Sequence, residues 1–230
     1  MMPGDLSQSS LLAALDGARI FYSDGRLHET ALIIAKEVIA NAFPDSNPGY
    51  ATRMRIPILI DAERKREGLD DLINLADYVV CSAKFPQAWT EAPTIAGALV
   101  SMLLRLPNVK FVIVTLGEDG CMMLERSINE VLNSEKTDID GLLESLKQRI
   151  DTDNIIPTCI SSMLTARGIG MVNAKLFLGT AEVIPPSELI DTTGAGDAFI
   201  GAILYGMSPK KMLPFAAQVV SALFHHCYKI

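Results

Sequence analysis

The chain has 230 residues, of which 49% are hydrophobic and 20% are charged, and its formal net charge is −7. This length suits one α/β domain with a sizeable core better than two domains. The acidic balance, with no long basic stretch, argues against a nucleic-acid partner. No run reaches the roughly 18 apolar residues of a membrane helix, because Arg105 interrupts the best candidate, Leu99–Leu106, so we expect no membrane association.

The cysteines, histidines and N-terminus carry no signal of secretion or of a metal centre. The four cysteines are scattered without C-x-x-C spacing, which favours buried thiols in a reduced, cytoplasmic protein. His225-His226-Cys227 has no partner cluster, so a solvated tail is favoured over a metal site. Residues 1–10 lack the basic and apolar regions of a signal peptide; an organellar destination stays open.

Apolar runs typical of strands alternate with apolar runs typical of helices from residue 18 to residue 124. Strands are expected at Ala18–Tyr22, Ile56–Ile60, Tyr78–Cys81, Phe111–Thr115 and Cys121–Leu124. Helices are expected at His28–Ala42, Leu69–Ala76 and Ala92–Leu106, with a turn-rich loop at Pro44–Gly49. Strands separated by helices predict a parallel sheet covered by helices on both faces, which is a three-layer, Rossmann-like α/β fold.

Polar residues stand at the carboxyl ends of four of these strands. In open parallel sheets the ligand lies beyond the carboxyl ends of the strands. Asp24, Asp61, Ser82 and Thr115 all fall at those ends. Residues 127–167 break the alternation: they are polar, hold one expected helix at Ile139–Ile150, and are interpreted as an insertion.

The segment Asp191-Thr192-Thr193-Gly194-Ala195-Gly196-Asp197-Ala198-Phe199 carries the strongest chemical signal. It predicts a turn that opens a helix, because an apolar helical segment follows it. Gly194 and Gly196 let the backbone approach a ligand closely, and the free N–H groups of a first helical turn bind anions. Asp197 is placed to take a proton from a hydroxyl beside that anion. An anion cradle beside a base is the minimum equipment for phosphoryl transfer.

This segment closely resembles the C-terminal signature of the ribokinase-like (PfkB) carbohydrate kinases. The resemblance implies a ribokinase-like fold and transfer of the γ-phosphate of ATP, with Mg²⁺, to a sugar or similar alcohol. It makes Asp197 the general base and Gly194, Ala195 and Gly196 the anion hole. It also places Asp191 and Thr193 where such kinases hold an activating monovalent cation such as K⁺.

A second motif lies upstream, in the order that the family shows. A strand ending at Thr115 runs into a glycine turn with Gly117 and Gly120, which resembles the family's nucleotide-binding T-x-G-x-x-G turn. Taken alone, such a turn is more often structural, but its place upstream of the signature, in the order of the family, favours nucleotide binding by Thr115, Gly117 and Gly120. The chain also resembles the ketohexokinase-like branch around residues 20–26, 58–63 and 76–82. That analogy lets Arg26 face a nucleotide or substrate phosphate, and a solvated surface arginine is an equal alternative.

Some elements of the family pattern are not found. The N-x-x-E motif linked to the metal would place Asn at Ser82 and Glu at Phe85. Residues 1–17 lack the β-lid, the glycine pair and the early aspartate that bind the sugar, and residues 221–230 lack the usual last strand. We therefore expect a single partial kinase domain over residues 1–230, truncated at its N-terminus and altered at its C-terminus. Such a chain should bind ATP weakly, phosphorylate sugars poorly and tend to self-associate.

The sequence therefore favours an ATP-dependent carbohydrate kinase acting on the hydroxyl of a sugar-like small molecule. It contains no G-x-x-x-x-G-K-[ST] P-loop, and no strand runs into G-x-G-x-x-G, which argues against a dinucleotide-dependent oxidoreductase. One alternative is a catalytically impaired, nucleotide-binding partner that forms a homo- or heterodimer with a full-length relative. Another is a nucleoside kinase, because the acceptor itself is not specified by these motifs.

Overall fold

The computed structural model describes residues 6–40, 55–127, 136–148, 158–179, 181 and 193–207. The N-terminal part contains α1 (Gln8–Leu15), β1 (Phe21–Ser23), α2 (His28–Ala40), β2 (Ile58–Ala62), α3 (Leu69–Ile73), β3 (Tyr78–Ser82) and α4 (Phe85–Thr90). The remainder contains α5 (Ile95–Arg105), β4 (Phe111–Thr115), β5 (Cys121–Arg126), β6 (Lys136–Asp138), α6 (Ile139–Lys147), β7 (Thr158–Ala166), β8 (Gly170–Gly179) and α7 (Ala195–Gly206).

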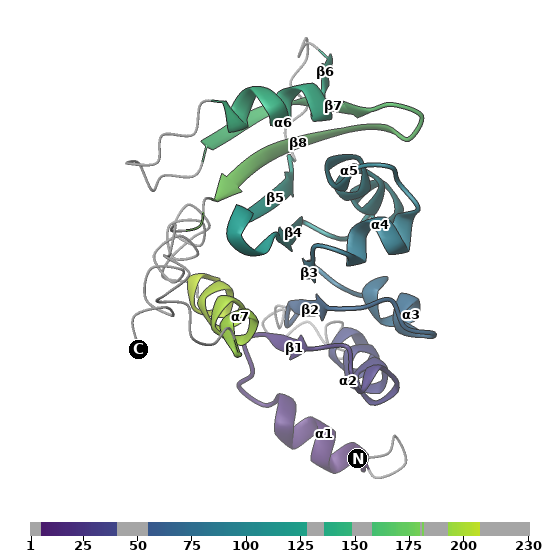
Figure 1. Cartoon of the computed structure of the whole chain (residues 1–230). Coiled ribbons are helices and arrows are strands. Elements are labelled where there is room, and N and C mark those ends of the chain that lie inside the picture. The colour runs from purple at the N-terminus through teal and green to yellow at the C-terminus, as the bar shows by residue number, and fades with distance from the viewer. Residues whose placement is uncertain are drawn as a thin grey trace, which may run out of the picture.

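The strands form one sheet in the order β1-β2-β3-β4-β5-β8-β7-β6 (Figure 1). Strands β1 to β4 are parallel, as the sequence predicts. Strand β5 is antiparallel to β4 and to β8, and β8 is antiparallel to β7. The α/β class is confirmed, but the sheet is mixed rather than wholly parallel. The cause is local, since the five-residue connection from Leu116 to Gly120 is too short for a parallel crossover.

Alternate residues of the central strands enter two separate cores, one on each face of the sheet. On β2 and β4, Ile58, Ile60 and Val112 belong to the larger core, whereas Leu59 and Ile113 belong to the smaller one. The larger core contains residues of α2 to α6, and the smaller core contains Phe199, Ile200 and Ile203 of α7. Helices therefore cover both faces, which confirms the predicted three layers.

Helices α3 and α5 have boundaries that differ from the predicted ones. Helix α5 begins at Ile95 rather than Ala92, because the Thr94 side chain caps it by accepting a hydrogen bond of 3.0 Å from the Gly97 N–H. Helix α3 ends at Ile73, three residues before the predicted end. No described helix is long and apolar enough to span a membrane.

The polar segment 127–167 holds more regular structure than its sequence predicts. The expected helix is present as α6, capped by Asp138, whose carboxylate accepts a 2.9 Å hydrogen bond from the Gly141 N–H. Strands β6 and β7, which the sequence analysis did not predict, pair with each other and extend the main sheet through β8. The interpretation of this segment as an insertion stays a prediction. The predicted loop at residues 44–49 and the chain beyond residue 207 lie outside the described residues.

Candidate active site

Polar residues at the carboxyl ends of the four parallel strands meet in one pocket beside α7. Asp24, Asp61, Ser82 and Thr115 all line it, as expected for residues at the carboxyl ends of parallel strands. The opposite wall comes from the first turns of α7 and includes Gly194, Gly196 and Asp197. Two segments far apart in the sequence, residues 24–115 and 194–200, therefore form one site.

The predicted anion hole lies in the first turn of α7, and its role as an anion site stays a prediction. Gly194 precedes the helix with a φ of 80°, a left-handed conformation that favours glycine, and no side chain caps the helix. The first intrahelical hydrogen bond runs from the Ala198 N–H to the Gly194 carbonyl, at 2.9 Å. The N–H groups of Ala195, Gly196 and Asp197 consequently have no acceptor within the helix. A Cβ atom at Gly194 or Gly196 would meet nothing within 4 Å, so a ligand has room to approach.

Carboxylates crowd the pocket. Asp61 is close enough to Asp24, Glu63 and Asp197 for their charges to act on it. Burial, followed by the repulsion of these three carboxylates, raises the pKa of Asp61 to about 6. Asp197 itself is exposed on the first turn of α7, where its carboxylate is accessible to a ligand held by the helix amides.

Tyr22 is a partner of Asp61 that the sequence analysis did not include. Its side chain is hydrogen-bonded to the Asp61 carboxylate, and this bond partly offsets the rise in the pKa of Asp61. Burial and the neighbouring carboxylates raise the pKa of Tyr22 to about 12, so the phenol stays protonated and donates. The signal for this pair was the period of two in strands, because it puts Tyr22 and Asp24 on one face of the sheet, and Asp61 and Glu63 likewise.

The floor of the pocket is tied together across β2, β3 and β4. The Ser82 hydroxyl donates to the Glu63 carbonyl at 2.6 Å, and the Thr115 hydroxyl donates to the Cys81 carbonyl at 3.4 Å. The Cys81 thiol donates to the Ile113 carbonyl at 3.1 Å. Burial raises the pKa of this thiol well above its ordinary value, so Cys81 is a neutral wall residue and not a nucleophile.

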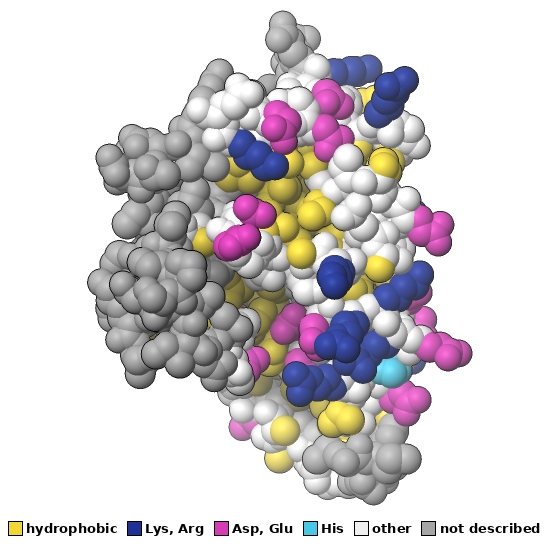
Figure 2. Space-filling model, in the orientation of Figure 1, with side chains coloured by type: hydrophobic (Ala, Val, Ile, Leu, Met, Phe, Trp, Pro, Cys, Tyr) yellow, Lys and Arg dark blue, Asp and Glu magenta, His cyan; other side chains and the backbone are white. Residues whose placement is uncertain are grey.

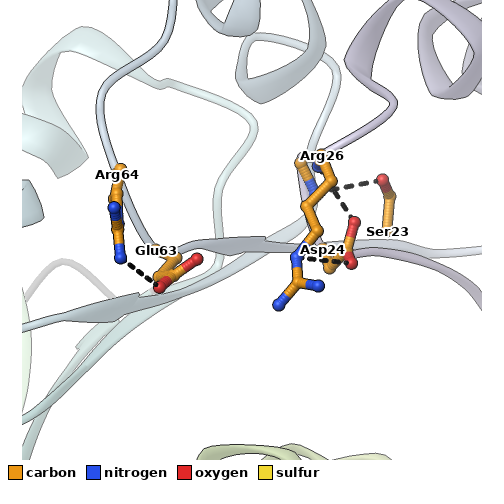
Figure 3. Close-up of polar contacts among 6 residues, drawn as sticks. Ser23, Asp24, Arg26, Glu63 and Arg64 are labelled. Atoms are coloured by element: carbon orange, nitrogen blue, oxygen red, sulfur yellow. Dashed lines mark hydrogen bonds and ion pairs between the residues drawn. The ribbon is translucent and has the colours of Figure 1, made fainter.

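Arg26 lies at the mouth of the pocket, at the end of β1 (Figure 3). Its Nε is 3.4 Å from the Asp24 Oδ2, and 68% of its side chain is exposed. Glu63 pairs in the same way with Arg64, at 3.4 Å, after the end of β2. Both readings of Arg26, a phosphate ligand or a solvated arginine, stay open on this geometry.

The predicted nucleotide turn follows β4, but only its first residue lines the pocket. Residues Gly117–Asp119 form a short 3-10 helix, and Gly117 has a φ of 65° with nothing within 4 Å of a Cβ position. Gly120 has a φ of 84°, and a Cβ there would lie 2.0 Å from the Gly179 carbonyl oxygen. Packing against the end of β8 therefore requires glycine at residue 120, whatever a nucleotide requires.

The candidate cation site is only partly described. Thr193 lies in the turn before α7, whereas Asp191 lies outside the described residues. Within the described ranges, no group of three or more His, Cys, Asp or Glu residues is arranged to hold a metal ion. We therefore assign no residue to Mg²⁺.

Comparison with known proteins connects this geometry to a family. Residues 164–223 match the model of the pfkB family carbohydrate kinases. The resemblance predicted from the signature is thereby confirmed, and the ketohexokinase-like branch stays a prediction. No curated protein matches the chain.

Solved structures of kinases share the fold. The chain is similar to adenosine kinase from Schistosoma mansoni, with a TM-score of 0.62 and 14% identity over 99% of this chain and 55% of that one. Adenosine kinase from Anopheles gambiae gives a TM-score of 0.60 and 16% identity over 96% of this chain and 53% of that one. Ribokinase from Thermotoga maritima gives 0.52 and 19%, over 94% and 50%. The chain thus spans about half the length of these structures.

Proposed function

We propose that this chain is part of an ATP-dependent phosphotransferase that phosphorylates a hydroxyl group of a sugar or a nucleoside. The family match and the fold shared with ribokinase and adenosine kinase structures support a kinase of this kind. The observation that carries the proposal is the pocket that brings Asp197 beside the free amides of the first turn of α7.

In the proposed reaction, Asp197 takes the proton from the acceptor hydroxyl, which then attacks the γ-phosphorus of ATP while ADP leaves. General-base catalysis of this kind is typically worth about 10²–10⁴-fold in rate. The amides of Ala195, Gly196 and Asp197 stabilise the negative charge on the transferring phosphoryl group. Mg²⁺, when bound, would neutralise charge on the phosphate oxygens.

The nucleotide is proposed to extend from the anion hole towards the turn after β4. Thr115 lines the pocket at that end, and Gly117 offers open backbone next to it. Gly120 has a packing role in any case. Thr193, together with Asp191, is proposed to hold a monovalent cation such as K⁺ beside the anion hole.

The proposed activity is tested by measuring transfer of the γ-phosphate of ATP to an acceptor. The full chain is incubated with ATP labelled in its γ-phosphate and with ribose, fructose or adenosine, and the label in the acceptor is counted. Binding of ATP is measured separately by calorimetry. Transfer of label to an acceptor supports the proposal. A chain that neither binds ATP nor transfers label would refute it.

A second candidate is a nucleotide-binding partner of a longer kinase. It is favoured by the coverage, since this chain corresponds to about half of the solved kinases that it matches. In that case the chain binds ATP without transferring phosphate, and it associates with itself or with a full-length relative. Sedimentation of the purified chain, alone and mixed with a full-length relative, separates this candidate from the first.

A further inference from the structure

The pocket beside α7 has an apolar wall next to its carboxylates. Val80, Phe199 and Ile200 line it and belong to the smaller core. Asp61 adjoins this wall, because Asp61 and Val80 are paired directly across β2 and β3. Figure 2 shows acidic side chains beside hydrophobic surface in the region of β1 and β2. A polyol matches such a pocket, since its C–H groups are apolar and its hydroxyl groups donate hydrogen bonds to carboxylates.

Two of the four carboxylates that line the pocket are engaged with arginine residues. Asp24 lies 3.4 Å from the Arg26 Nε and also accepts a hydrogen bond of 2.9 Å from the Arg26 N–H. Glu63 lies 3.4 Å from an Arg64 nitrogen. None of the ion pairs among the described residues involves Asp61. The Asp61 carboxylate therefore faces the pocket without a Lys or Arg partner in the described part of the chain.

Asp61 has unused capacity to accept hydrogen bonds. A carboxylate has about four acceptor positions, and the phenol of Tyr22 is the one side-chain donor to Asp61 among the described residues. Asp61 is half-buried, and burial is the main reason that its pKa rises to about 6. A hydrogen bond to a partly desolvated acceptor is stronger than one to an acceptor in water. A ligand hydroxyl group in this pocket would gain such a bond at Asp61.

Asp61 also lies across the pocket from the proposed base. Asp197 stands in the first turn of α7, on the wall opposite the strand ends. The two carboxylates are near enough for the charge of Asp197 to raise the pKa of Asp61. An acceptor bound at Asp197 therefore lies between this residue and Asp61.

We propose that Asp61 is a specificity-determining residue, whose carboxylate accepts a hydrogen bond from a second hydroxyl group of the acceptor while Asp197 takes the proton of the first. The apolar wall at Val80 and Phe199 then contacts C–H groups of the same molecule and keeps water from this hydrogen bond. A site built to bind a substrate hydroxyl rejects the analogue without it, because the buried acceptor is left unpaired. This inference rests on the proposed function and adds a residue that selects the acceptor.

The experiment removes the hydroxyl group and the carboxylate in turn. Calorimetry measures binding of adenosine, 2′-deoxyadenosine, 3′-deoxyadenosine, ribose and 2-deoxyribose to the full chain in the presence of ADP. We expect at least one deoxy compound to bind the wild type about tenfold more weakly than its parent. In Asp61→Ala this ratio should fall to roughly threefold or less. Asp61→Asn keeps the size of the side chain and one acceptor oxygen, so its ratio should lie between these two values.

The ratio of affinities separates a direct contact from a general effect. A change of charge or shape in the pocket weakens a parent compound and its deoxy analogue alike, so only a contact with the missing hydroxyl group changes their ratio. Asp70→Ala is the matched control, because Asp70 also accepts one side-chain hydrogen bond, from the Trp89 indole N–H at 2.6 Å, but does not line the pocket. It should keep the wild-type ratio. Circular dichroism melting checks that each variant is folded.

Two results would overturn the inference while leaving the proposed function in place. One is a wild-type chain that binds ADP but binds no deoxy compound more weakly than its parent, including a chain that binds none of these compounds. The other is an Asp61→Ala variant that keeps the wild-type ratio. A fall in the affinity of this variant for the Mg²⁺ complex of ADP would then assign the carboxylate to the metal of the nucleotide. A chain that binds neither ADP nor any acceptor would refute the proposed function as well.

Discussion

The two halves of the sheet differ in what their strand ends do. In the parallel half, β1 to β4, every strand ends at the same edge, and the polar residues at these strand ends line one pocket with α7. In the other half, β5 is antiparallel to β8 and β8 is antiparallel to β7, while β6 is parallel to β7, so the strand ends are divided between the two edges. None of the described lining residues comes from this half. Strand direction therefore decides which half of the sheet can bring polar residues together in one pocket. The other half contributes residues to the core and pairs with the parallel half.

The largest effect expected from this comparison is on turnover. Asp197→Asn removes the proposed base but keeps the shape of the side chain, so phosphate transfer by an active form should fall by about 10²–10⁴-fold. Binding of ATP should persist. Asp71→Asn is the matched control, because Asp71 is likewise the third residue of its helix, α3, and is exposed. Transfer rates are measured with labelled ATP; near-full turnover in Asp197→Asn would remove this residue as the base.

Gly120 and Gly194 have similar φ values, but their substitution should change the free energy of unfolding by different amounts. Gly120→Ala puts a Cβ 2.0 Å from the Gly179 carbonyl, at the contact between β5 and β8, and should lower the free energy of unfolding by about 3 kcal/mol. The melting temperature should then fall by roughly 6–12 °C. Gly194→Ala meets open space, so strain alone should cost about 1 kcal/mol, while nucleotide affinity falls because the methyl group enters the pocket. Urea unfolding and calorimetry measure both quantities. Equal losses of stability would contradict the division of roles.

The same contrast explains what the sequence could predict. Four residues were predictable as neighbours, since each stands at the carboxyl end of an apolar strand and the ends of parallel strands share an edge: Asp24, Asp61, Ser82 and Thr115. The turn at Gly194 was predictable from its local pattern. Strand β7 was not, because it lies in a polar segment and its place in the sheet depends on pairing with β8, which the sequence analysis did not predict either. The period of two puts Tyr22 and Asp24 on one face and Asp61 and Glu63 on one face, but the contact of Tyr22 with Asp61 also depends on the register between β1 and β2, which the period alone does not give.

A smaller effect is expected at the turn after β4. Gly117→Ala places a methyl group in open space at a φ of 65°, and ATP affinity should fall by roughly three- to tenfold, or about 0.7–1.4 kcal/mol. Valine is a poor choice here, because a β-branched residue at this φ is strongly strained. Gly168→Ala is the control: it has a φ of 76°, equally open surroundings, and a place on the β7–β8 hairpin. Calorimetry with ATP decides the case, and if both variants lose affinity equally, the turn has only a structural role.

The smallest effect concerns the pH dependence of stability. Burial and three nearby carboxylates raise the pKa of Asp61 from 3.8 to about 6 in the folded chain. The folded state therefore binds this proton more tightly than the unfolded state. Stability from Asp61 is complete below pH 3.8 and is lost as the pH rises towards 6. Allowing for solvent screening, the loss should be about 1 kcal/mol.

Variants of Asp61 and Tyr22 test both the direction of this pH dependence and its physical cause. In Asp61→Asn, the loss of stability between pH 4 and pH 7 should shrink relative to the wild type, because no proton is released at residue 61. In Tyr22→Phe, the hydrogen bond that lowers the pKa of Asp61 is absent, so the transition should move to higher pH. Asp71→Asn, at an exposed site on α3, should leave the profile unchanged. Urea unfolding at a series of pH values gives all three curves. If Tyr22→Phe moved the transition to lower pH, the hydrogen bond would not be what stabilises the Asp61 carboxylate, and burial with the surrounding charges would have to account for the pKa alone.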